Sequence, residues 1–234
     1  MIKYITETQQ KLNSEQKEFY TINNAQVYVK NNVVSPNGES ISVKNVISKV
    51  EGIIPAHLLA YVEFIIVGWF DEFEKRDINS FYEDGTLYIS NFQDNEDDMI
   101  DDIIHEIAHS LEVPLGREIY GDGKIEKEFI SKRTALYRIL EADGYDVNIV
   151  DFLNTEFDQK LDDFLYKSVG YDKLSGYLAG IMISPYSATS IREYFAEVFQ
   201  TFYLTPELNY TQKISPEVYQ KINELHIGFF LDEQ

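Results

Sequence analysis

The sequence contains no cysteine. Disulfide bonds are therefore impossible, and a zinc site built from thiolates is excluded. Positive charge is scarce as well, because 20 Lys and Arg stand against 40 Asp and Glu and leave a net charge of −20. Such a surface repels nucleic-acid backbones and anionic membranes, so we expect neither as a partner.

Long uninterrupted apolar runs are also missing. The most apolar stretch, residues 53–70, is broken by Pro55 and Gly68 and predicts a buried helix followed by a strand, not a membrane span. The first residues lack the apolar segment of a secretory signal. The cytoplasm is therefore the default expectation, with a phage-encoded protein or export by another route as open alternatives.

The composition and periodicity predict an α+β protein. A hydrophobic content of 44% in 234 residues supports a folded core. Residues 1–42 read as an N-terminal arm with a possible hairpin around the turn sequence SPNG, and residues 43–234 as the main domain. Residues 62–70 and 86–90 are the expected strands, the second following an Asp-Gly turn. Helix is expected over 43–60 apart from a break at Pro55, and again from a cap at Asp94 or Asn95 to an end at Pro114 and Gly116. Further helices are expected at 125–142, 149–166, 172–182, 190–203 and 215–229.

The segment HEIAH within DDIIHEIAHSLE carries the main chemical signal. His105 and His109 are four residues apart, so on a helix their imidazoles point the same way and can bind one metal ion. Zinc accepts neutral imidazole readily. Glu106 flanks the pair and can take a proton from water there. A polar edge on an ordinary helix is the competing interpretation, although two of the four histidines fall in this one motif.

A catalytic zinc site needs a third protein ligand, and no further histidine fits well. The segment IREYFAEVFQTFY, residues 191–203, offers Glu193 and Glu197 on one face of an otherwise apolar helix. Carboxylates beside so much apolar surface are uncommon unless they are paired or bind metal. Pairing with Arg192 or with surface lysines is the alternative, and the residues alone leave the choice open.

The combination of H-E-x-x-H with a later E-x-F-A-E resembles the glutamate-zincins related to the anthrax lethal factor catalytic domain and the Pro-Pro endopeptidases. The resemblance implies that Glu193 binds one zinc per chain and that Glu197 supports a ligand from outside the coordination sphere. It also implies a catalytic tyrosine seven residues before the ligand, which is Tyr186 here. A zincin-like fold follows from it, with a small twisted mixed sheet above the histidine helix and a mostly helical C-terminal half.

The same resemblance implies that residues 86–90 form an edge strand that pairs with the substrate, through Thr86, Leu87, Tyr88 and Ile89. The separation of His109 from Glu193 is longer than in those relatives, so residues 113–180 are expected to hold inserted helices. The predicted function is zinc-dependent endopeptidase activity on a protein or peptide, with Glu106 as general base and Tyr186 stabilising the oxyanion. The alternative is a catalytically silent zinc-binding structural or interaction protein, such as a virion component.

Overall fold

The computed structural model describes residues 18–205 and 208–228. The chain divides into two compact units, with the boundary between Pro114 and Leu115. The first unit contains a five-stranded mixed sheet, and the described part of the second is helical. The predicted α+β class is confirmed at this level.

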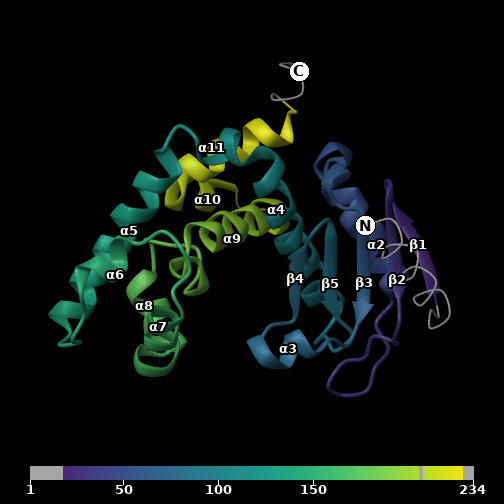
Figure 1. Cartoon of the computed structure of the whole chain (residues 1–234), viewed down its shortest axis with the longest axis horizontal. Coiled ribbons are helices and arrows are strands. Elements are labelled where there is room, and N and C mark those ends of the chain that lie inside the picture. The colour runs from purple at the N-terminus through teal and green to yellow at the C-terminus, as the bar shows by residue number, and fades with distance from the viewer. Residues whose placement is uncertain (1–17, 206–207, 229–234) are drawn as a thin grey trace. The chain divides into compact units, whose positions relative to one another are not determined.

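The sheet of the first unit has the strand order β1-β2-β3-β5-β4 (Figure 1). The three inner strands run parallel to one another, and each outer strand is antiparallel to its neighbour. The strands are β1 (Glu18–Ile22), β2 (Ala25–Val29), β3 (Phe64–Gly68), β4 (Ser80–Glu83) and β5 (Thr86–Ser90).

The predicted strands at 62–70 and 86–90 are confirmed as β3 and β5. The turn between β4 and β5 is formed by Asp84 and Gly85, whose φ angles are 45° and 81°. An Asp-Gly pair adopts this left-handed conformation at low cost, which explains why the sequence predicted the turn.

Two expectations about the sheet were wrong. The hairpin around SPNG does not form, because Val34 and Ser40 make only an isolated bridge and Val43–Ile53 is helix α2. The N-terminal hairpin is instead β1–β2, so residues 18–29 belong to the sheet and are not a separate arm. Residues 86–90 are not an edge strand, since β5 lies between β3 and β4.

The two faces of the sheet differ in composition. Val27, Ile65 and Leu87 are in register on three neighbouring strands and are fully buried. The alternate positions carry larger side chains, and Phe81 stacks on Tyr88 with 4.5 Å between ring centroids. This alternation places an aliphatic layer on one face and an aromatic layer on the other.

Helix α4 (Glu96–Tyr120) carries the histidine motif on a long apolar stripe. A kink lies where the end of this helix was predicted, at Pro114. Pro114 lacks the N–H for a helical hydrogen bond, and Leu115 has non-helical angles of φ −117° and ψ 17°. A second helical segment then continues to Tyr120. The buried residues of the stripe in the first unit are Met99, Ile100, Ile103, Ile104, Ile107, Ala108 and Leu111.

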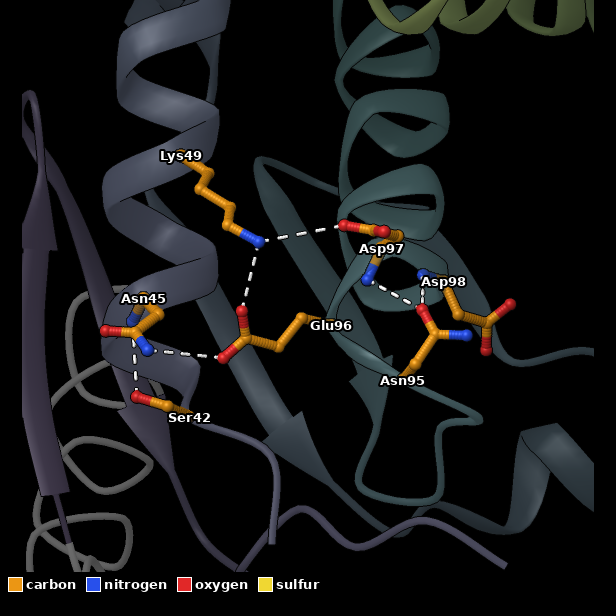
Figure 2. Close-up of polar contacts among 7 residues, drawn as sticks. All are labelled: Ser42, Asn45, Lys49, Asn95, Glu96, Asp97 and Asp98. Atoms are coloured by element: carbon orange, nitrogen blue, oxygen red, sulfur yellow. Dashed lines mark hydrogen bonds and ion pairs between the residues drawn. The ribbon is translucent and has the colours of Figure 1, made fainter. Parts of the chain in front are cut away.

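The N-termini of α2 and α4 are capped and linked by polar side chains (Figure 2). The Asn95 carboxamide oxygen accepts from the backbone N–H groups of Asp97 and Asp98 at 2.8 and 3.0 Å, which confirms the predicted helix start. Lys49 of α2 donates to Glu96 at 3.0 Å. The two helices therefore lie side by side.

Shorter helices complete the first unit. They are η1 (Ala56–Tyr61) and α3 (Asp71–Arg76). The expected break at Pro55 within residues 43–60 is confirmed, since α2 ends at Ile53 and Pro55 precedes η1. The residue before a proline disfavours helical geometry, which accounts for the break.

The second unit consists of helices and helical turns. The prediction of one helix over 149–166 was wrong, because Asn148 and Asp158 each cap a separate short helix. The elements are α5 (Lys124–Ala142), α6 (Ile149–Leu153), α7 (Gln159–Asp163), the π-helical η2 (Phe164–Val169), α8 (Tyr171–Leu178), η3 (Tyr186–Ala188), α9 (Ile191–Leu204), α10 (Leu208–Ile214) and α11 (Pro216–His226).

Glu128 joins three of these helices. Its carboxylate accepts a hydrogen bond from the Tyr194 hydroxyl of α9 at 2.5 Å. The other oxygen accepts from the backbone N–H of Glu217 at the start of α11 at 3.0 Å. Because Tyr194 is fully buried, this contact fixes the rotation of α9 within the second unit. Across the described residues of both units, every helix is too short or too polar to span a bilayer.

Candidate metal centre

His105 and His109 lie on one face of α4, as the spacing predicted. Their Nε2 atoms are 3.2 Å apart, and their rings meet at an interplanar angle of 72°. Two nitrogen ligands of a tetrahedral zinc ion, each at the usual bond length, are separated by about 3.3 Å. The histidine pair therefore has the spacing of two ligands that share one ion.

Glu106 is buried beside the histidines, with 4% of its surface exposed. The hydroxyl of Ser80, at the start of β4, donates a hydrogen bond to Glu106 Oε1 at 2.7 Å. Ser80 pairs with Ile89 in the sheet, and Ile89 is fully buried. The face of the sheet that carries Ile89 and Ser80 is therefore the one that α4 covers.

Glu112 is a neighbour of His109 that the sequence analysis did not assign. Its Oε1 lies 3.6 Å from His109 Nδ1, and its side chain is only 5% exposed. A carboxylate beside the non-ligating nitrogen of a metal-binding histidine favours the tautomer whose Nε2 is free to bind metal. The three-residue spacing on one helix could have indicated this contact.

Asp102 lies one turn before Glu106 on α4. Burial raises its pKa to about 7, a nearby Asp98 and Glu106 add to the rise, and the hydrogen bond from Gln93 and the charge of His105 oppose it. The Gln93 amide donates to Asp102 at 2.8 Å and to the Ser90 carbonyl at 3.2 Å. Gln93 was also missed, because its contact depends on a loop whose path the sequence does not reveal.

In the second unit, Glu193 and Glu197 lie on α9, where both are half-buried. The Ser190 hydroxyl caps this helix by accepting from the Glu193 backbone N–H at 3.1 Å. The cap fixes the first turn and with it the position of Glu193. The predicted helix at 190–203 is thereby confirmed within one residue at each end.

Tyr186 lies in η3, between two short turns that hold its backbone. The Tyr186 carbonyl accepts from both the backbone N–H and the hydroxyl of Thr189, at 3.0 and 2.8 Å. Ser184 and Ser187 form a reciprocal pair of hydrogen bonds around it. These side-chain contacts replace regular structure in a segment where the sequence predicted none.

Part of the predicted insertion lies close to the α9 carboxylates. Burial raises the pKa of Tyr171 at the start of α8 to about 12, and the charges of Asp162, Glu197 and Glu193 contribute. The pKa of Asp162 in α7 is raised by burial and by its neighbours Asp163 and Glu193. Helices α7 and α8 therefore place acidic and phenolic groups around Glu193.

In the part of the chain that the structure describes, His105, His109 and Glu193 are the histidine and acidic side chains that could together hold a metal ion. Two imidazoles and one carboxylate are a donor set that zinc accepts, with a fourth position left for water or substrate.

Of the predicted substrate-binding residues Thr86, Leu87, Tyr88 and Ile89, none can pair with a substrate backbone through a free strand edge. The backbone of β5 is bonded to β3 on one side and to β4 on the other. The outermost strand on this side of the sheet is β4. The edge-strand expectation came from the resemblance to the glutamate-zincins, and the Asp-Gly turn could not correct it because such a turn does not say which strand of a hairpin faces outward.

No protein-family model matches this chain, and no curated protein or solved structure is significantly similar to it.

Proposed function

We propose that this protein is a zinc-dependent endopeptidase of the glutamate-zincin class that binds one zinc ion per chain. The observation that carries the proposal is the 3.2 Å separation of the His105 and His109 Nε2 atoms. That separation is what a tetrahedral zinc ion requires, so the pair needs no rearrangement to bind one. A buried carboxylate next to it, that of Glu106, supplies the second element of a hydrolytic site.

The proposed ligands are His105, His109 and Glu193. Their chemistry fits zinc better than magnesium or calcium, which favour oxygen ligands alone. When bound, the ion supplies a Lewis acid that polarises the scissile carbonyl and makes a water molecule more acidic. Glu197 is proposed to support a ligand from the next turn of α9.

Glu106 is the proposed general base and then general acid. It accepts a proton from the attacking water and returns that proton to the departing amine. The Tyr186 hydroxyl is proposed to donate a hydrogen bond to the oxyanion that develops on the scissile carbonyl. Loss of one such donor typically lowers turnover by about 10²–10³.

The proposed substrate is an extended peptide that adds to the outer strand β4. An antiparallel strand at the margin of a sheet can hydrogen-bond a peptide backbone along its free side. Ser80, the first residue of β4, contacts the proposed general base, so this margin leads to the catalytic carboxylate. The net charge of −20 favours basic peptides over acidic ones.

Cleavage of a diverse peptide library, read by mass spectrometry, tests the proposal. Wild type is compared with Glu106→Ala and with Glu126→Ala, which removes an exposed glutamate of α5 as a matched control. We expect cuts from wild type and from the control, and none from Glu106→Ala. The residues around each cut then define the subsites.

The alternative function gives a different result. A catalytically silent zinc-binding protein leaves the library uncut in all three samples while it retains one zinc ion per chain. That outcome would overturn the peptidase proposal and favour a structural or interaction role for the metal centre.

A further inference from the structure

We infer that Ser80 is a positioning residue for the Glu106 carboxylate, an inference that rests on the proposed function. The Ser80 hydroxyl donates to Glu106 Oε1 at 2.7 Å. The two residues are 26 positions apart, and Ser80 lies outside the H-E-x-x-H motif. Hydrogen bonds to an ionised carboxylate are shorter and stronger than those between neutral groups.

The backbone of the sheet fixes the position of Ser80. Ser80 pairs with Ile89 of β5, and the neighbouring Ser90 N–H donates to the Asn79 carbonyl at 2.8 Å. Side chains alternate between the two faces of a strand, so the Ser80 hydroxyl points to the same face as the buried Ile89. The donor is therefore held by regular strand pairing and does not depend on a loop.

Ser80 has no competitor for this contact within the described part of the chain. The nearby Gln93 amide donates to Asp102 and to the Ser90 carbonyl, not to Glu106. A buried carboxylate requires hydrogen-bond donors, since leaving it unsatisfied is costly. Ser80 thus determines which way the Glu106 carboxylate faces.

The hydrogen bond from Ser80 gives the two oxygens of the Glu106 carboxylate different roles. Oε1 accepts from Ser80, which leaves Oε2 available for the proton of the attacking water. A carboxylate held in one rotamer loses less freedom when it reacts, and general-base catalysis depends closely on such geometry. Ser80 does not itself touch the reacting atoms, so its effect should appear in turnover and not in substrate binding.

The first test measures kcat, KM and zinc content for wild type, Ser80→Ala, Ser80→Thr and Ser90→Ala. We expect Ser80→Ala to lower kcat about tenfold or more, with KM and zinc content unchanged, because a hydrogen bond to a charged group is lost. Ser80→Thr keeps the hydroxyl on a β-branched side chain that suits a strand, so it should restore most of kcat. Ser90→Ala is the control, since its hydroxyl accepts from the Phe92 N–H instead.

The second test does not depend on catalysis. Protein labelled with carbon isotope at the glutamate side-chain carboxyl carbon is studied by NMR without added metal, and the Glu106 resonance is assigned by its loss in Glu106→Gln. Ser80→Ala should shift this resonance, and Ser80→Thr should leave it near its wild-type position. The Ser90→Ala control should not move it.

The outcomes separate the two proposals. If wild type cleaves peptides and Ser80→Ala retains wild-type kcat, or if the Glu106 resonance does not move, the role of Ser80 is overturned and the peptidase proposal stands. A fall in kcat that Ser80→Thr does not restore would also overturn it, because the hydroxyl would then not be the cause. If wild type cleaves nothing, the proposed function fails and the positioning role fails with it.

Discussion

Asp102 shows how the surroundings of one residue set its chemistry. Burial raises its pKa from 3.8 to about 7 even though Gln93 and the charge of His105 favour ionisation. The pKa of this carboxyl is higher in the folded protein than in the unfolded protein. Such a carboxyl stabilises the folded protein most when the pH is below its pKa in the unfolded protein. That contribution is lost as the pH rises through about 7.

We predict that Asp102→Asn becomes more stabilising as the pH rises. The amide is neutral at every pH and its oxygen can still accept from Gln93. The free energy of unfolding should exceed that of wild type by on the order of 1–2 kcal/mol near pH 8, and the difference should vanish near pH 4. Urea denaturation followed by the fluorescence of Trp69, the one tryptophan in the sequence, measures the first unit.

The exposed acid Asp94 provides the control for this prediction. Asp94→Asn makes the same substitution at an exposed site and should have little effect on the free energy of unfolding. An Asp102→Asn difference that does not vary with pH would show that the substitution acts through packing and not through ionisation.

The polar residues around Glu106 also show where sequence reasoning stops at this scale. Glu112 is three positions from His109 on the same helix, and a periodicity argument reaches it. Ser80 and Gln93 contact α4 from a strand and a loop, and nothing in their local sequence indicates this. Contacts between segments depend on pairing register, which is set by the whole sheet.

At the scale of elements, α4 depends on its N-terminal cap. The Asn95 side chain satisfies two backbone N–H groups of the first turn, and the acidic residues there lie at the positive end of the helix dipole. These interactions hold the start of the helix that carries the histidines.

We predict that Asn95→Ala lowers the free energy of unfolding of the first unit by about 1 kcal/mol. The backbone groups of Asp97 and Asp98 lose their acceptor, and alanine cannot replace it. Asn95→Asp keeps an acceptor and should remain near wild type. Trp69 fluorescence in urea measures both, and equal losses for the two variants would contradict a capping role.

The ends of helices and strands also differ in how well the sequence predicts them. The end of α2 near Pro55 and the Asp-Gly turn were predictable because they depend on local backbone preferences. The kink at Pro114 was predictable on the same ground, but the second helical segment that runs to Tyr120 was not. Burial of Ile119 stabilises that segment through packing, which no local backbone preference indicates.

At the scale of the whole molecule, the proposed zinc ligands come from residues far apart in the sequence. His109 and Glu193 are separated by 84 positions, and the boundary between the two compact units falls between them. Binding of zinc to such ligands stabilises the folded protein by mass action. Metal content and metal affinity therefore test the proposed centre independently of any peptidase assay.

We predict one zinc ion per chain in wild type and a large difference between the two α9 carboxylates. Glu193→Gln removes a direct ligand and should weaken zinc binding by more than about 100-fold. Glu197→Gln should weaken it by about 10–100-fold, the usual cost of losing a residue that supports a ligand. Competition with a chromophoric chelator measures both affinities.

The reverse order of these two affinities would assign Glu197 as the ligand and contradict the resemblance to the glutamate-zincins. If both variants bound zinc as tightly as wild type, neither glutamate would bind the metal or support a ligand. Removal of zinc with a chelator should lower the unfolding temperature of wild type but not that of a His105→Ala variant.

The sequence by itself determined the features that depend on local periodicity and side-chain chemistry. The apolar stripe of α4, the facing of His105 and His109, the strands β3 and β5 and the limits of α9 all follow from spacing along a helix or strand. The absence of cysteine and the H-E-x-x-H motif also restricted the metal site to nitrogen and oxygen ligands.

Only the tertiary structure decided the features that join distant segments. It made β4 and not β5 the outer strand and placed Ser80 against Glu106. These relations depend on strand order and on the packing of whole elements, where many residues contribute small energies together. No short stretch of sequence contains that information.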